Sequence, residues 1–180
     1  MAVCHHPGLR IGPAVNVQLA TDTESRAVVG VEVTNEGADS AGLSEPLREQ
    51  VEQRTGQKVE QQLLDGGYLK TDDLERAHQQ GVAFFIPSKP ARTPGRRGRE
   101  LEPRPGDSDA VRAWKERMGS AEGKEIYKQR ASTSETVNAD LRCHRGLVPM
   151  TVRGLKKARC VALWCALAYN VMHLGAALLM

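Results

Sequence analysis

The stretch KVEQQLLDGGYLKTDDL, residues 58–74, is the one that decides the fold class, because it passes from a strand through a turn to a helix. Residues 58–65 form a short segment in which the apolar pair Leu63 and Leu64 precedes Asp65, which is typical of a strand. Gly66 and Gly67 then break the pattern. Helical spacing of apolar side chains starts after Thr71. We therefore predict a strand that ends at Asp65, a glycine turn and a helix.

The elements on either side of this stretch continue the alternation of strands and helices. The alternating segments 14–21 and 27–34, joined by a polar turn, predict an antiparallel hairpin. A helix is expected over 44–55, and a further strand over 82–87. The predicted order is β-β-α-β-α-β, which indicates an α/β fold. Helical patterns dominate the remainder of the chain.

Composition divides the 180 residues into four parts. The third part is rich in proline, glycine and arginine, which is typical of a loop or linker. The expected parts are an irregular lead-in (1–13), an α/β core (14–87), a Pro/Arg-rich loop or linker (88–107) and a helical part that completes the domain (108–180).

The net charge of +3 hides an asymmetry between the two halves of the chain. Residues 1–85 carry 7 Lys or Arg against 13 Asp or Glu, whereas residues 86–180 carry 18 against 9. A basic half suits a polyanionic partner such as DNA. The alternative is that these charges only solvate exposed faces of the protein.

Two further features bear on location. The four cysteines show no metal-ligand spacing, so no zinc site is expected, and scattered thiols suit a reducing cytosol. Residues 161–180 carry no formal charge and are long enough to span a membrane. Asn170 and His173 near the centre of this segment make a buried helix packed against a sheet the better prediction. A tail-anchored membrane protein is the alternative.

Two acidic residues are candidates for chemistry. Asp65 lies at the end of a strand, where sites form in open α/β sheets. Glu135 lies in a predicted helix, and Arg142 shares its face seven residues later. Carboxylates of this kind hold Mg²⁺ ions in two-metal phosphoryl transfer. The competing interpretation makes Asp65 an ordinary turn residue and Glu135 a partner in a surface ion pair.

Several segments together resemble the C-terminal catalytic region of DDE-type bacterial insertion-sequence transposases. They are NVQLATD, VVGVEVTNEGADS, LLDGGYL, GVAFFIPSKP, YKQRASTSETVNADLR and VRGLKKARCVALWCALAYNVM, within residues 14–174. The resemblance implies an RNase H-like mixed sheet flanked by helices. It also implies that two aspartates and a glutamate bind Mg²⁺ and that the protein cuts and joins DNA. Asp65 matches the second aspartate, and Glu135 matches the glutamate.

The family signature Tyr-x2-Arg-x3-Glu-x6-Lys maps onto Tyr127, Arg130, Glu135 and Arg142. The chain departs from it by one extra residue before Glu135, and by arginine in place of the final lysine. The resemblance and the basic composition together imply the following DNA contacts: Tyr127, Lys128, Arg130, Arg142, Arg153, Lys156 and Lys157.

The first aspartate of the family is the missing piece. The resemblance implies three strands before the first helix, whereas the pattern here predicts two, and residues 1–12 contain no acidic residue. Asp22, at the end of the first predicted strand, is the nearest substitute. We therefore expect a fragment that lacks the first strand and has impaired activity.

This fragment is expected in the bacterial cytoplasm, associated with the nucleoid, with DNA and a second copy of the chain as partners. A non-catalytic DNA-binding module is the main alternative function.

Overall fold

A computed structural model describes residues 15–35, 44–90 and 98–178. The predicted lead-in 1–13 lies outside these residues, as do positions 91–97 of the predicted loop and the last two residues. The first sheet is an antiparallel hairpin of β1 (Asn16–Thr21) and β2 (Val28–Thr34), with Val17 opposite Val33. The predicted hairpin is thereby confirmed.

The second sheet contains β3 (Gln61–Leu63) and β4 (Ala83–Phe85), which pair in parallel. A parallel pair needs a crossover, and α2 (Thr71–Gln79) provides it after the 3₁₀ turn η2 (Gly66–Tyr68). Ordered strand pairing covers only three residues of the predicted strand 58–65. The glycine turn and the helix lie where the sequence predicts them.

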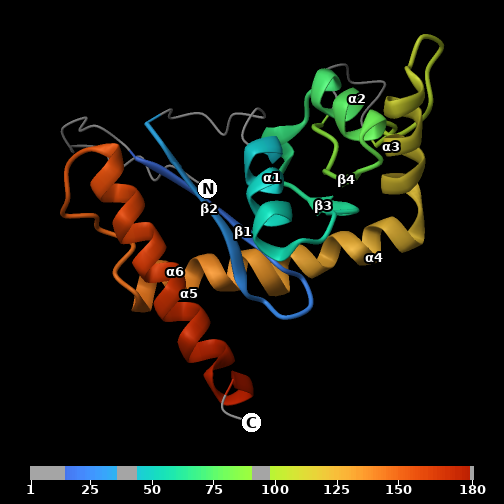
Figure 1. The fold of residues 1–180 in the computed structure, drawn as a ribbon. Coiled ribbons are helices and arrows are strands. Elements are labelled where there is room, and N and C mark those ends of the chain that lie inside the picture. The colour runs from blue at the N-terminus through green and yellow to red at the C-terminus, as the bar shows by residue number, and fades with distance from the viewer. Residues whose placement is uncertain (1–14, 36–43, 91–97, 179–180) are drawn as a thin grey trace.

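The mixed α/β fold class is confirmed, but the strands divide between two sheets. Neither β1 nor β2 pairs with β3 or β4 in the described part of the chain. α1 (Ser44–Thr55) follows β2 and packs against the first sheet, as Figure 1 shows. The mixture of parallel and antiparallel pairing expected of an RNase H-like sheet is therefore present, with a gap between its two halves.

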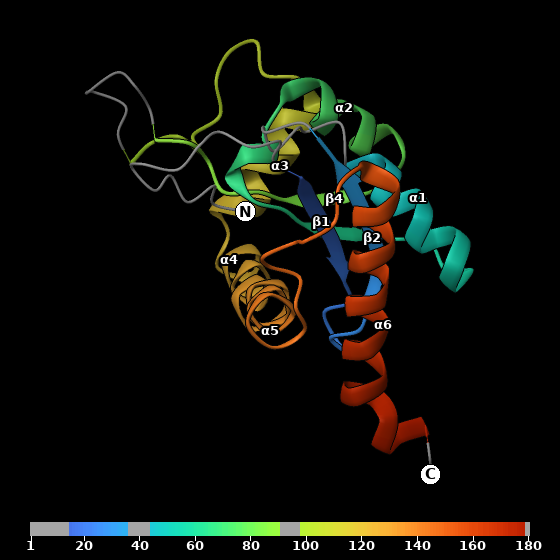
Figure 2. The same cartoon turned by 90° about the vertical axis from the view of Figure 1, so that its left-hand side faces the viewer.

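The second half of the chain is helical. α3 (Asp109–Gly119) leads into α4 (Ala121–Arg130), which continues through the π-turn η4 (Ala131–Glu135) into α5 (Thr136–His144). These last three elements form one long helix that passes both sheets (Figure 1), and Figure 2 looks nearly along it. α6 (Leu155–Leu178) then returns across β2.

Apolar side chains form two separate cores. The first core joins β1 and β2 to α5 and α6, and its fully buried members include Val31, Val137 and Leu141. The second core joins β4 to α2 and α3 around Phe85, Ile86 and Trp114. The indole of Trp114 donates to the carbonyl of Ile86 at 3.0 Å, which ties α3 to the end of β4. The long helix connects the two cores.

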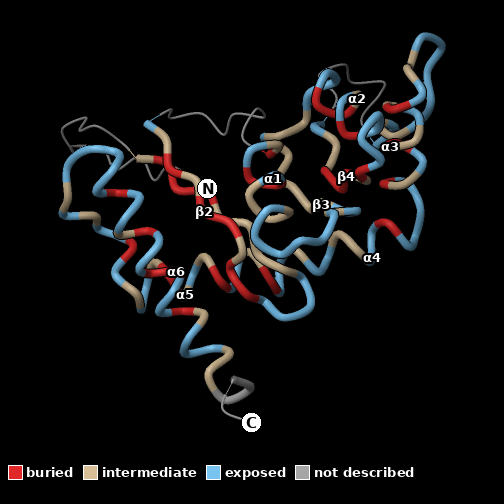
Figure 3. Tube along the Cα trace, in the orientation of Figure 1, coloured by how far each residue is buried: buried red, intermediate tan, exposed pale blue. Residues whose placement is uncertain are grey.

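The prediction of a buried C-terminal helix is wrong for one face of α6. Small residues such as Ala158 and Ala162 pack against the first core, and the Asn170 amide bonds both backbone groups of Val28 at 2.8 Å. The opposite face is open to solvent (Figure 3): Trp164 is 70% exposed and Met172 is 68% exposed. The two-stranded sheet and α5 cover only one side of this helix. Among the described residues, no helix has the length and apolar character needed to cross a membrane.

Candidate functional site

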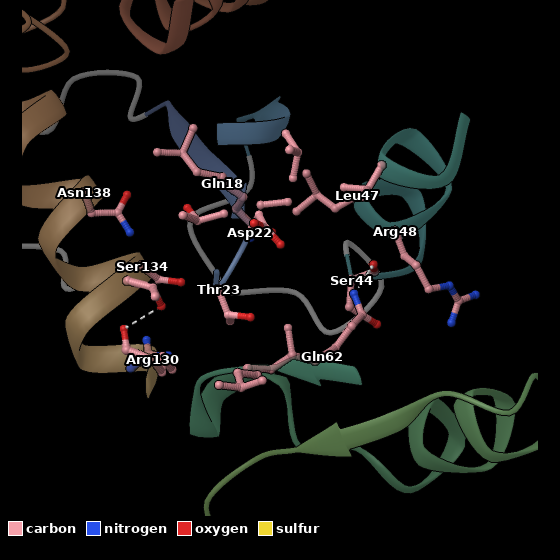
Figure 4. A pocket seen from close by; sticks show the side chains of 18 of the residues that line it. Gln18, Asp22, Thr23, Ser44, Leu47, Arg48, Gln62, Arg130, Ser134 and Asn138 are labelled. Carbon is pink, nitrogen blue, oxygen red and sulfur yellow. Dashed lines mark hydrogen bonds between the residues drawn. The ribbon is translucent and has the colours of Figure 1, made fainter. Parts of the chain in front are cut away.

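A cavity of about 1160 Å³ lies between the two cores. Its walls are β1, β3, α1 and the helical segment from η4 to α5, as the close view in Figure 4 shows. Asp22, Asp65 and Glu135 all line it, although they come from three distant parts of the sequence. The cavity therefore brings together every acidic residue that the sequence singles out.

Asp65 serves both as a turn residue and as a member of this cavity. It precedes η2, and its Oδ1 accepts a hydrogen bond from the Gly66 amide at 2.7 Å, which fixes the carboxylate at the end of the strand. Its Oδ2 lies 3.7 Å from a guanidinium nitrogen of Arg130. The turn interpretation of Asp65 is thus confirmed, whereas its role as a metal ligand stays a prediction.

Arg130 joins the two candidate carboxylates. Its Nη1 donates to Oε1 of Glu135 at 2.8 Å, while its Nη2 faces Asp65. The Arg130 side chain is 22% exposed, whereas the side chains of Asp65 and Glu135 are 45% and 59% exposed. A cation at this position offsets the repulsion between two acidic groups that would otherwise face each other across the cavity.

The π-turn η4 explains how Arg130 reaches Glu135. A single π-turn within an α-helix accommodates one extra residue, and such turns are frequent at functional sites. The chain has one extra residue between Arg130 and Glu135 relative to the family signature, and η4 covers Ala131–Glu135, which includes all of that interval. The ion pair spans five positions instead of four, so the π-turn keeps the two side chains on one face of the helix.

Asp22 lies just beyond β1 and has local partners. Its Oδ2 accepts hydrogen bonds from the Ser25 amide at 2.7 Å and the Ser25 hydroxyl at 2.6 Å. Partial burial acts to raise the pKa of Asp22, but hydrogen bonds from Ser25, Glu24 and Thr23 together outweigh it, so the pKa lies below its usual value. Asp22 therefore lines the cavity as a charged carboxylate that closes the β1–β2 turn.

A comparison with protein families identifies the second half of the chain. Residues 87–175 match the sequence model of a family described as Transposase DDE domain. This part of the chain is a DDE-type transposase catalytic region. The matched segment of the transposase contains Arg130, Glu135 and Arg142, whereas Asp22 and Asp65 lie before it. No curated protein and no solved structure matches the chain.

Membership in this family implies a role in transposition, DNA as partner and the use of divalent metal ions in general. The described residues of the transposase include no group of three or more Asp, Glu, His or Cys side chains that could hold a metal ion. They therefore do not fit a complete metal centre. Asp65 and Glu135 converge, but they converge on a guanidinium, and Asp22 is bonded to Ser25.

The residues predicted to bind DNA fall into two groups in the transposase. Arg130 and Arg142 line the cavity. Tyr127 lies beside Arg130, and burial raises its pKa. Arg153, Lys156 and Lys157 are exposed at and before the start of α6. Lys128 is also exposed but pairs with Glu125 at 2.6 Å. The structure therefore does not place all of the predicted DNA contacts on one surface.

Sequence patterns missed several polar residues that line the same cavity. Gln18 on β1 and Gln62 on β3 face it, and so does Asn138 on α5 (Figure 4). The only available signal is a glutamine at an inward position of a strand, between the apolar Val17 and Leu19. Glutamine on a strand is ordinary on exposed faces, so the signal becomes informative only once burial is known.

Proposed function

We propose that the chain is a transposase unit that binds transposon-end DNA and contributes carboxylates to metal-dependent cleavage and strand transfer. The observation that carries this proposal is the convergence of Asp65 and Glu135 on Arg130 in one cavity. The family match of residues 87–175 supports the same chemistry. Asp65 and Glu135 are the proposed metal ligands, Mg²⁺ is the proposed ion, and Asp22 is the substitute for the third carboxylate.

We further propose that the chain on its own is impaired in cleavage. Two-metal phosphoryl transfer depends on carboxylates that hold both ions about 3.5–4 Å apart. Here two carboxylates share a single arginine, and Asp22 is engaged by Ser25. An ion at Asp65 and Glu135 would compete with Arg130 for the same oxygens. DNA binding does not need this rearrangement and is expected to persist.

The exposed cations of the second half supply a DNA-binding surface in this proposal. Arg153, Lys156 and Lys157 show no carboxylate partner among the described residues and are therefore available to phosphates. A second copy of the chain is the other proposed partner. The exposed stripe of Trp164, Leu167 and Val171 on α6, with the spacing of a helix-pairing seam, is the surface that such a dimer would bury. Action on DNA implies a location at the bacterial nucleoid.

The experiment for DNA as partner is an anisotropy titration of labelled transposon-end DNA over a salt series. The affinity should fall steeply with salt. The double variant Lys156→Ala with Lys157→Ala should lower the affinity. It should also reduce the slope of log affinity against log salt concentration, by about one for each lysine–phosphate contact that is lost. Arg112→Ala, which removes a half-exposed cation from α3, is the control. Unchanged affinity in the double variant would contradict this DNA surface.

A non-catalytic DNA-binding module is the second candidate, and the incomplete carboxylate set favours it. The same titration separates the two, because added Mg²⁺ or Mn²⁺ should alter binding only if Asp65 takes part. If Asp65→Asn leaves both the DNA affinity and its metal dependence unchanged, the chain is better described as a non-catalytic DNA-binding module.

A further inference from the structure

We propose that side chains of α1 and α6 form a lock on the outer edge of β2, which keeps this strand from pairing with β2 of a second copy of the chain. The outer edge is the one that faces away from β1. The proposal concerns self-association only, and it depends neither on transposition nor on a metal. It starts from the hydrogen-bond partners of the β2 backbone.

β2 has the properties of a strand that would pair with another if its edge were open. In the described part of the chain it pairs with β1 alone, so its other side is an edge of the sheet. It has seven residues, VVGVEVT, four of them valine and one charged. Such segments have a high tendency to add further strands, and an uncovered edge is a template for them. We therefore examine what covers this edge.

α6 covers the beginning of β2. The side-chain amide of Asn170 accepts a hydrogen bond from the Val28 amide and donates one to the Val28 carbonyl, both at 2.8 Å. In an antiparallel ladder, a residue of a neighbouring strand makes this same pair of bonds. Asn170 thus takes the position that a residue of an incoming strand would need.

α1 covers the middle of β2. Oε1 of Gln50 accepts from the Val31 amide at 2.7 Å, and Nη1 of Arg54 donates to the Val29 carbonyl at 2.9 Å. Val29 and Val31 are two residues apart, so their backbone groups point to the same edge. Gln50 and Arg54 are four residues apart, so they lie on the same side of α1. One side of a single helix therefore binds two successive positions of this edge.

The end of β2 is covered by a side chain of the strand itself. The Val33 amide, the next one along this edge, donates to Oε1 of the adjacent Glu32 at 3.2 Å. A side chain therefore bonds a backbone group at every second residue from Val29 to Val33, and also at Val28. An incoming strand would have to displace these side chains before it could form a ladder.

The two helices reach the edge from opposite faces of the sheet. Val31 points into the first core, to which α6 belongs. The adjacent Gly30 faces α1, and a Cβ at this glycine would lie only 3.3 Å from Cδ2 of Leu47. The absence of a side chain at Gly30 lets α1 lie close to the strand, which brings Gln50 within reach of the edge. Movement of one helix alone would therefore open only part of the lock.

The test removes the bonding groups and keeps side chains of similar size. In the double variant Gln50→Met with Asn170→Leu, neither side chain can bond the β2 backbone. Amide exchange is followed by NMR, and molecular mass by sedimentation, over a range of protein concentrations. In dilute solution we expect at least tenfold faster exchange at Val28 and Val31 than in the unmodified chain. At high concentration the variant should associate, and exchange at these two amides should slow again.

Two controls separate the lock from a general loss of stability. Gln50→Glu keeps an oxygen that accepts from the Val31 amide, so it should behave as the unmodified chain. Asp107→Asn breaks the pair with Lys115 and leaves the covering side chains of β2 unchanged, so it should not associate through β2. Gln50→Met alone is the variant to use if the double variant does not fold. It should speed exchange at Val31 and leave Val28 protected by Asn170.

Three results would overturn the proposal. Unchanged exchange at Val31 in Gln50→Met would show that the glutamine does not guard the edge. A double variant that stays monomeric at high concentration, or whose protected amides lie outside β2, would show that the covered edge prevents no pairing. Equal association of Asp107→Asn would assign the effect to partial unfolding.

Discussion

Arg130 determines how the candidate site behaves at the scale of single residues. Its guanidinium contacts Glu135 within the same helix and Asp65 across the cavity, so it links the two halves of the molecule. Because both carboxylates are about half exposed, solvent screens much of this attraction. The arrangement is an ion-pair network of modest strength, and its main effect is to hold two carboxylates near one another.

Replacement of Arg130 tests this network. Arg130→Ala should lower the free energy of unfolding by about 1 kcal/mol, since it removes two partly exposed ion pairs and leaves two carboxylates without their cation. The loss should shrink at high salt. Urea denaturation at low and high ionic strength measures it.

Lys128→Ala is the matched control for Arg130→Ala. The pair of Lys128 with Glu125 is 71% and 73% exposed, so its loss should change stability by less than about 0.5 kcal/mol. Equal effects of the two substitutions would show that Arg130 has no special structural role.

Asp107 and Lys115 form a second ion pair, which is more buried than the first. Their side chains are 12% and 6% exposed and lie 2.6 Å apart. The hydrogen bond from Lys115 holds the pKa of Asp107 below its usual value of 3.8. A carboxyl whose pKa is lower in the folded state adds stability above its unfolded pKa. That stability is lost as the pH falls through the lower, folded pKa.

Asp107→Asn should therefore destabilise the protein at neutral pH, by about 1.5–3 kcal/mol for a lost hydrogen bond to a charged group. The difference from the unsubstituted chain should narrow once the pH falls well below 3.8. Urea titrations at pH 7 and near pH 2.5 measure both values. Asp109→Asn, at a side chain that is 86% exposed, should show no such pH dependence, and an equal difference at both pH values would contradict the account.

At the scale of elements, the long helix from α4 to α5 places Glu135 at the cavity. Its π-turn coincides with the extra residue of the signature motif, so an insertion that would rotate Glu135 away from Arg130 is absorbed locally. Sequence periodicity predicts helix over 122–144 but carries no signal for the π-turn. The reason is that a π-turn depends on which faces of the helix must stay buried. Here the buried face carries Val137 and Leu141, and periodicity does not show what covers it.

Deletion of one residue distinguishes the π-turn from the regular helix around it. Removal of Ser132, which is exposed within η4, should convert the turn to α-helix and keep both flanking faces, with a change in Tm of less than about 5 °C. Circular dichroism during heating measures this change.

Removal of Ala139, also exposed but in α5, is the control deletion. It should rotate Val137 or Leu141 out of the first core and cost more than about 3 kcal/mol, in the range of a large buried side chain. Equal tolerance of both deletions would contradict the proposed role of η4.

At the scale of the whole molecule, local patterns and long-range contacts differ in what the sequence reveals. The hairpin, the glycine turn after β3 and the order of helices follow from periodicity and turn residues, which act over a few positions. The split into two sheets and the open face of α6 depend on which surfaces meet, and periodicity does not carry that information. The convergence of Asp65 with Glu135 was expected only from the family resemblance, and the guanidinium between them was not expected.

The most direct test of the central claim, that Asp65 and Glu135 belong to an incomplete DDE site, is a cleavage and strand-transfer assay. The chain is incubated with DNA that carries terminal inverted repeats, with Mg²⁺ or Mn²⁺, and products are resolved on a sequencing gel. The account predicts salt-dependent DNA binding with little or no cutting, and the loss of any residual cutting in Glu135→Gln. Robust cutting by the unmodified chain, or residual cutting unchanged in Glu135→Gln, would contradict it.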